Sequence, residues 1–163
     1  MPTPGFPRSL NALGEMMKVL DARKQRGIQD PPGREPSAPI PTGRELLALG
    51  TANQTRLAGA PVRGVLFEFS PQMDEYLKNH LFGAIFARDN LEWQSREIAT
   101  VGALAAMPGV ESQLRSHIGF SMNVGLSPAQ LRQLAEVLAQ RGQPEAARRV
   151  QAAIAQHSNP LVR

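Results

Sequence analysis

The sequence contains no cysteine among its 163 residues. This absence excludes disulfide bonds, thiolate zinc sites and the redox chemistry of a Cys-x-x-Cys pair. Aromatic residues are also scarce, with one tryptophan and one tyrosine available to stack on nucleotide bases. The net charge is +4, but the lysines and arginines are scattered among acidic residues. We therefore expect no nucleic-acid partner.

Long apolar segments are missing as well. No stretch approaches the ~20 apolar residues that a membrane-spanning helix needs. The first twenty residues, MPTPGFPRSLNALGEMMKVL, hold no continuous apolar segment of the kind that directs secretion. We therefore expect a cytoplasmic protein without a membrane partner.

Helical periodicity is the dominant pattern that is present. Hydrophobic residues make up 42% of the chain, which suffices for a real core, and no segment shows sustained alternation of apolar and polar residues. The fold class is therefore all-α. The spacing of apolar residues, together with Ser-Pro pairs at helix starts and glycines at helix ends, predicts the helices. They cover residues 9–24, 43–57, 71–88, about 93–107, 110–123, 128–141 and 145–156. Ser70, Asp89-Asn90 and Ser127 are the predicted N-terminal caps.

The N-terminal quarter differs in composition from the rest. The segment GIQDPPGREPSAPIPTG, residues 27–43, is rich in proline, which removes backbone donors and disfavours helix in the preceding residue. We expect residues 28–42 to lack regular secondary structure. The sequence thus predicts an N-terminal helix with a proline-rich arm over residues 1–42 and an all-helical domain over residues 43–163, with a compact bundle at about 66–156.

Two titratable residues interrupt apolar helix stripes on either side of the Met-Pro-Gly turn. Glu97 lies eleven residues before Pro108 and His117 lies nine after it, so two antiparallel helices would place them at nearly the same height. Their neighbours at helical spacing are mostly apolar, among them Val101 and Leu114. A carboxylate on such a stripe needs a partner, and an imidazole is suited to be one. We expect the two side chains to lie within reach of a hydrogen bond or a single water.

This pair has two interpretations. In the functional one, Glu97 orients the imidazole and His117 transfers a proton. In the structural one, a polar pair, Glu-His or Glu-Arg with Arg96 or Arg115, only stabilises the packing. The sequence leaves both open.

The other histidines are isolated in the pattern. His80 sits among apolar residues in LKNHLFGAIFARD, where a buried core residue is the ordinary interpretation. Together with Glu97 and His117 it could complete a mixed metal site, although no local spacing motif supports one. His157 is expected to be solvated near the C-terminal end.

Phosphate-loop, dinucleotide, zinc-protease and nucleophile-elbow motifs are all missing.

Residues 80–138 carry a more specific signal. The run HLFGAIFARDNLEWQSREIATVGALAAMPGVESQLRSHIGFSMNVGLSPAQLRQLAEVL contains an Arg-Glu pair, small residues before the hinge, the Gln-Leu-Arg-Ser-His segment and a polar helix start. In this order it resembles the carboxymuconolactone decarboxylase family, which includes the alkylhydroperoxidase D-like proteins. The resemblance implies an all-α bundle of that type, which with the proline-rich N-terminal arm is the fold we expect.

The resemblance also implies chemistry. In the peroxidase branch a Cys-x-x-Cys pair acts with a histidine and a glutamate; His117 and Glu97 match the latter two, but no cysteine is present, which excludes thiol peroxidase activity. The decarboxylase branch needs no cysteine and no cofactor. It implies a lyase of aromatic-compound catabolism in which His117 protonates carbon and Glu97 holds its tautomer. Arg96 or Arg115 would bind the substrate carboxylate, with His80 and Asn123 as further substrate-binding residues.

Two function classes therefore remain. The first is a cofactor-free and metal-free enzyme acting on a small carboxylate or lactone through Glu97 and His117. The second is a non-catalytic oligomeric scaffold or partner-binding member of the family, in which the pair is structural. An open pocket at His117 would favour the enzyme, and a sealed pair the scaffold. Family members form rings, so we expect a homo-oligomer, trimer or hexamer, with His80 at a shared edge.

Overall fold

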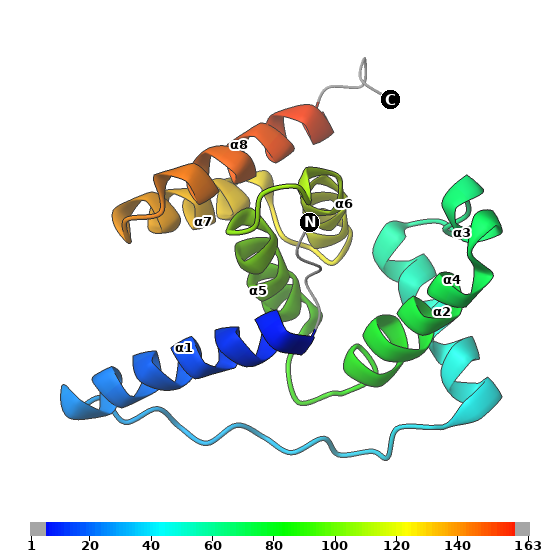
Figure 1. The fold of residues 1–163 in the computed structure, drawn as a ribbon, viewed down its shortest axis with the longest axis horizontal. Helices are drawn as coiled ribbons and strands as arrows, with labels where there is room; N and C mark the ends of the chain where they lie inside the picture. The colour runs from blue at the N-terminus through cyan, green and yellow to red at the C-terminus, as the bar shows by residue number, and fades with distance from the viewer. Residues whose placement is uncertain (1–5, 159–163) are drawn as a thin grey trace. The chain divides into compact units, whose positions relative to one another are not determined.

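A computed structural model describes residues 6–158 of the chain. These residues form eight α-helices and one π-helical segment, without any strand (Figure 1). The all-α prediction is thus confirmed. The chain divides into two compact units, Met1–Arg34 and Glu35–Arg163. None of the described helices is both long and apolar enough to cross a membrane.

The first unit is dominated by one helix, α1 (Phe6–Gln25). Gly27 reverses the chain after it with a φ of 75°, and Arg23 then binds the carboxylate of Asp30 through two hydrogen bonds of 2.9 and 2.5 Å. This ion pair holds the pKa of Asp30 below its usual range, chiefly through the hydrogen bonds from Arg23. The apolar side chains of the helix are largely exposed within this unit, namely Leu10, Leu13, Met16, Met17, Val19 and Leu20.

The proline-rich segment contains no helix or strand between residues 28 and 42, as predicted. Ser37, a residue of the proline-rich segment that belongs to the second unit, is hydrogen-bonded to Asp89. Its backbone N–H donates to Asp89 Oδ1 at 2.8 Å, and its hydroxyl donates to the other carboxylate oxygen. Asp89, in the connection before α5, therefore anchors the part of the proline-rich segment that belongs to the second unit.

The second unit contains the remaining helices. They are α2 (Gly43–Ala58), α3 (Val65–Phe69), α4 (Pro71–Leu77), the π-helical η1 (Lys78–Ile85), α5 (Trp93–Ala105), α6 (Glu111–Asn123), α7 (Pro128–Gln140) and α8 (Pro144–Ser158). Sequence periodicity predicted all of these except α3, which lies between the predicted helices over residues 43–57 and 71–88. It also predicted one continuous α-helix over 71–88, and that expectation is wrong because the helix widens at Lys78.

Close packing accompanies this π-helical segment. Helix α2 crosses η1 at Gly50, where a Cβ would collide with the carbonyl oxygen of Lys78. At Gly83 a Cβ would lie 2.8 Å from Leu46 Cδ1 and 2.9 Å from the same carbonyl oxygen. Two glycines thus allow α2 and η1 to approach each other more closely than side chains would permit.

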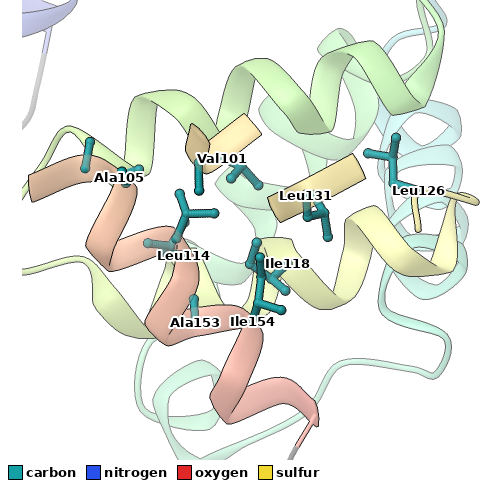
Figure 2. Close-up of a cluster of buried hydrophobic side chains, with 12 residues drawn as sticks. Val101, Ala105, Leu114, Ile118, Leu126, Leu131, Ala153 and Ile154 are labelled. Carbon is teal, nitrogen blue, oxygen red and sulfur yellow. The ribbon is translucent and has the colours of Figure 1, made fainter. Parts of the chain in front are cut away.

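The main core lies between α5, α6, α7 and α8. Figure 2 shows Val101 from α5, Leu114 and Ile118 from α6, and Ile154 from α8 pointing into one cluster. Burial of these apolar side chains drives the packing of the four helices. Arg149 of α8 also donates to the carbonyl oxygen of Ala105 at 2.6 Å, at the end of α5.

A second, smaller cluster joins α2 and η1 to α5 and α6. Its buried members are Leu57, Phe82 and Phe86, packed against partly buried residues that include Trp93 and Phe120. The Phe86 and Trp93 rings meet edge to face with centroids 5.6 Å apart. This aromatic cluster connects the N-terminal helices of the unit to the helices that carry Glu97 and His117.

The predicted caps have mixed outcomes. Ser127 caps α7 through a reciprocal arrangement with Gln130, as the Ser-Pro pattern predicts. Ser70 precedes α4, but its side chain makes no capping hydrogen bond. Asp89-Asn90 does not cap α5, because the chain continues to Glu92 before that helix begins. The two residues instead serve the connection itself, where Asp89 binds Ser37.

Candidate active site

Glu97 and His117 meet inside the second unit. Nδ1 of His117 lies 2.8 Å from Oε2 of Glu97, which confirms the predicted contact. Glu97 comes from the second turn of α5 and is fully buried, and His117 comes from the middle of α6 and is 9% exposed. The short turn through Pro108-Gly109, where Gly109 has a φ of 85°, allows the two consecutive helices to pack against each other.

The surroundings of the pair are apolar, as the stripes predicted. Val101 and Leu114, each one turn from a member of the pair, are buried in the main core. The Phe120 ring packs edge to face on the His117 imidazole with centroids 5.0 Å apart. Low polarity strengthens the attraction between the carboxylate and a proton on the ring.

The hydrogen-bonding capacity of the pair is only partly used. Oε1 of Glu97 is buried without a partner among the described residues. Since Nδ1 faces the carboxylate, an N–H at Nδ1 would donate to Oε2 of Glu97 and leave Nε2 as the other ring nitrogen. The arrangement can therefore hold one imidazole tautomer.

The pair does not line any of five cavities found in the described part of the chain. The linings of these cavities contain neither Glu97 nor His117. One cavity of about 280 Å³ is lined by Ser116, Gly119 and Phe120, which lie next to His117 on α6. His117 is therefore close in sequence to residues of this cavity wall but does not line the cavity itself.

Arg96 is not placed as a free carboxylate clamp. Its Nε donates to the carbonyl oxygen of Leu91 at 3.1 Å, and its Nη2 donates to the carbonyl oxygen of Arg88 and to Asn90 Oδ1, both at 3.0 Å. Burial, together with the charge of Arg88, lowers the pKa of Arg96. Its side chain thus stabilises the connection between η1 and α5.

Arg115 lies on the exposed side of α6 and lines the small cavity beside Phe120. Its guanidinium donates to Gln156 Oε1 at 3.3 Å. His157 is exposed, as expected, but its ring covers Gly119, where a Cβ would lie 2.9 Å from Cε1 of His157. This cavity therefore holds a guanidinium and an imidazole that the sequence pattern did not associate.

Asn123 is the last residue of α6 and lines this cavity as well as a larger one. Its Nδ2 donates to the carbonyl oxygen of Leu57 at 2.7 Å, which satisfies an acceptor at the C-terminal end of α2. Its side-chain nitrogen is thus engaged in holding α2 to α6.

His80 lies on η1 and is exposed, so its interpretation as a buried core residue is wrong. It lines none of the five cavities named above. Among residues 6–158 no three histidine or carboxylate side chains gather closely enough to hold a metal ion. The fold therefore does not bring His80 to Glu97 and His117.

The largest of these five cavities could not be predicted from the sequence. It has a volume of about 640 Å³, and its walls include Arg56 of α2, Arg88 and Trp93. No motif marks Arg56 or Arg88. The available signal was Trp93, the only tryptophan of the chain, one turn before Glu97.

The chain was compared with known proteins. The sequence model of the carboxymuconolactone decarboxylase family matches residues 71–156, which include α4 to α7, most of α8 and both members of the buried pair. No curated protein matches the chain in sequence. The family match covers more than half of the chain and agrees with the helical bundle described above. The chain therefore belongs to the carboxymuconolactone decarboxylase family.

Proposed function

We propose that the protein is a lyase of the carboxymuconolactone decarboxylase type, which removes carbon dioxide from a small lactone carboxylate. His117 is the proton donor and Glu97 its positioning residue. The observation that carries this proposal is the 2.8 Å contact between a fully buried carboxylate and a nearly buried imidazole. Such a pair keeps a proton available in an apolar environment without a cofactor.

In the proposed step, one proton replaces the carboxylate on the substrate carbon. When the C–C bond to the substrate carboxylate breaks, carbon dioxide leaves and the electron pair is delocalised into the conjugated lactone. The protonated imidazole of His117 then donates from Nε2 to the ring carbon. The imidazole regains a proton from solvent, and Glu97 holds Nδ1–H throughout, so that only Nε2 exchanges protons.

The scaffold interpretation has one specific observation in its favour. Neither member of the pair lines one of the five cavities named above, so a substrate would need either a rearrangement of the wall beside Phe120 or a neighbouring subunit to complete the site. In this second candidate function the pair stabilises the α5–α6 contact, and the chain is a non-catalytic oligomeric or partner-binding member of the family.

A substrate screen separates the two candidates. The purified wild-type chain is incubated with carboxymuconolactone and related lactone carboxylates, and ¹³C NMR detects carbon dioxide released from a labelled carboxylate. The enzyme predicts turnover of at least one of these compounds. If a folded chain releases no carbon dioxide from any of them, the scaffold is the better account.

A further inference from the structure

A cavity of about 640 Å³ in the second unit combines two guanidinium groups with an aromatic wall. It lies where α2, the η1–α5 connection and the end of α6 come together. We propose that this cavity binds a small carboxylate with a flat apolar body, of the size of a benzoate ion. The proposal is independent of the proposed function, because neither Glu97 nor His117 lines the cavity.

Arg56 contributes the first cationic group. Its Cζ lies 4.5 Å from the centroid of the Trp93 ring, so the guanidinium is stacked on the aromatic face. Among the described residues no carboxylate forms an ion pair with it. This contact holds the guanidinium at the cavity wall, where its N–H groups can donate to an oxyanion.

Arg88 contributes the second cationic group to the cavity wall. Its Nε donates to the carbonyl oxygen of Ala84 at 3.4 Å. Arg88 makes no ion pair with a carboxylate among the described residues. A bound anion would supply the opposite charge that this guanidinium lacks, which a neutral ligand could not do.

The N-terminal end of α5 adds partial positive charge at the same cavity. Its N-cap residue, Glu92, makes no side-chain capping hydrogen bond, and Trp93 and Gln94 of the first turn line the cavity. The first N–H groups of a helix have no acceptor within it and carry partial positive charge. This end of the helix thus adds to the two guanidinium groups.

Two acidic residues, Asp89 and Glu92, also line the cavity. Both interact with other groups, and Asp89 accepts hydrogen bonds from the backbone and the hydroxyl of Ser37. Arg56 and Arg88, by contrast, form no ion pair with a carboxylate among the described residues. Phe86 and Trp93 supply the apolar surface, which selects a flat hydrocarbon body behind the carboxylate.

The test uses the only tryptophan of the chain, Trp93, as a reporter in the cavity wall. Its fluorescence is titrated with benzoate and, in parallel, with benzamide, which has the same ring but no charge. We expect a saturable change with benzoate and binding of benzamide at least about tenfold weaker. Equal binding of the two compounds, or no saturable change with benzoate, would overturn the proposal.

Variants locate the site, with calorimetry as the readout because removal of Arg56 also changes the surroundings of Trp93. Arg56→Gln and Arg88→Gln should each weaken benzoate binding by about tenfold, whereas Arg132→Gln on the exposed side of α7 should not change it. His117→Gln should also keep wild-type affinity, which separates this site from the proposed active site. If benzoate binding survives both cavity variants, or is lost with His117→Gln, this cavity is not the site. Circular dichroism confirms that each variant is folded.

Discussion

Oε2 of Glu97 and Nδ1 of His117 are 2.8 Å apart although twenty residues separate them in the chain. The carboxylate is fully buried, and its second oxygen has no partner among the described residues. The imidazole is therefore the hydrogen-bond partner on which the burial of this carboxylate depends.

Glu97→Ala should lower the free energy of unfolding by about 3–5 kcal/mol, because it creates a void and leaves the imidazole without its partner. Glu97→Gln should cost clearly less, since its amide oxygen can still accept the Nδ1 hydrogen bond. Urea unfolding at neutral pH measures both. An alanine variant as stable as the wild type would show that the pair is not buried as described.

Gly50 should not tolerate a side chain. In Gly50→Ala the new Cβ collides with the backbone carbonyl of Lys78, so α2 and η1 must move apart. We expect a clear drop in the melting temperature. Gly102→Ala in α5 is the matched control, since nothing lies within 4 Å of its Cβ and alanine favours helix by about 1 kcal/mol. The order of the two melting temperatures tests the close approach, and the reverse order would contradict it.

The pKa of Glu111 should lie below the ordinary value of a glutamate side chain. Hydrogen bonds from the backbone N–H of Gly109, at 3.0 Å, and from its own N–H lower its pKa. A lowered pKa in the folded state stabilises the fold above the unfolded-state pKa, and this contribution is lost as the pH falls through the folded-state value. The stability difference between wild type and Glu111→Gln should therefore shrink toward acidic pH. An NMR titration of the Glu111 carboxyl gives its pKa directly, and an ordinary value would refute the assignment.

Arg96 should stabilise the connection before α5 rather than bind a ligand. Arg96→Ala removes its hydrogen bonds to Arg88, Asn90 and Leu91, and we expect a loss of about 1–3 kcal/mol in unfolding free energy. Arg96→Lys should restore little of it, because an ammonium cannot reproduce the planar fork. Chemical denaturation compares the three proteins. Full rescue by lysine would mean that only the charge matters.

We also propose that the chain forms a homo-oligomer. Five large apolar side chains on the contacting helices α3 and α4 are 59–88% exposed, namely Val65, Leu66, Phe69, Met73 and Tyr76. Large exposed apolar areas on a protein surface often mark an interaction site. Light scattering at micromolar concentration should give a mass several times 17.7 kDa. Replacing Leu66 and Phe69 by Ser should reduce that mass, and a clean wild-type monomer would contradict the proposal.

Much of this architecture was predictable from local pattern. The helices from α5 to α8 follow from apolar spacing and from Ser, Pro and Gly at their ends, and the height of Glu97 and His117 follows from counting residues across the Pro108-Gly109 turn. The residues that carry the family resemblance also lie in this part of the chain, which explains why both the fold and the pair were predictable.

The remaining features depend on tertiary contacts that no local pattern contains. The π-helical widening at Lys78 accompanies the approach of Gly50 from a helix almost thirty residues earlier. The hydrogen bonds of Arg96 could not be predicted, because its sequence position beside Glu97 does not reveal the carbonyl oxygens that the fold brings to it. The cavity containing Arg56 and Trp93 was missed for the same reason, since its walls come from three separate segments.

The central claim is that His117 donates the proton to carbon, and the rate of decarboxylation of the best lactone carboxylate tests it most directly. His117→Gln should lower kcat by about 10²–10⁴-fold while the KM changes little, and Glu97→Gln should lower kcat to a smaller extent. His157→Gln serves as a control for the loss of an exposed imidazole and should leave kcat unchanged. Wild-type kcat in a folded His117→Gln variant would contradict the account.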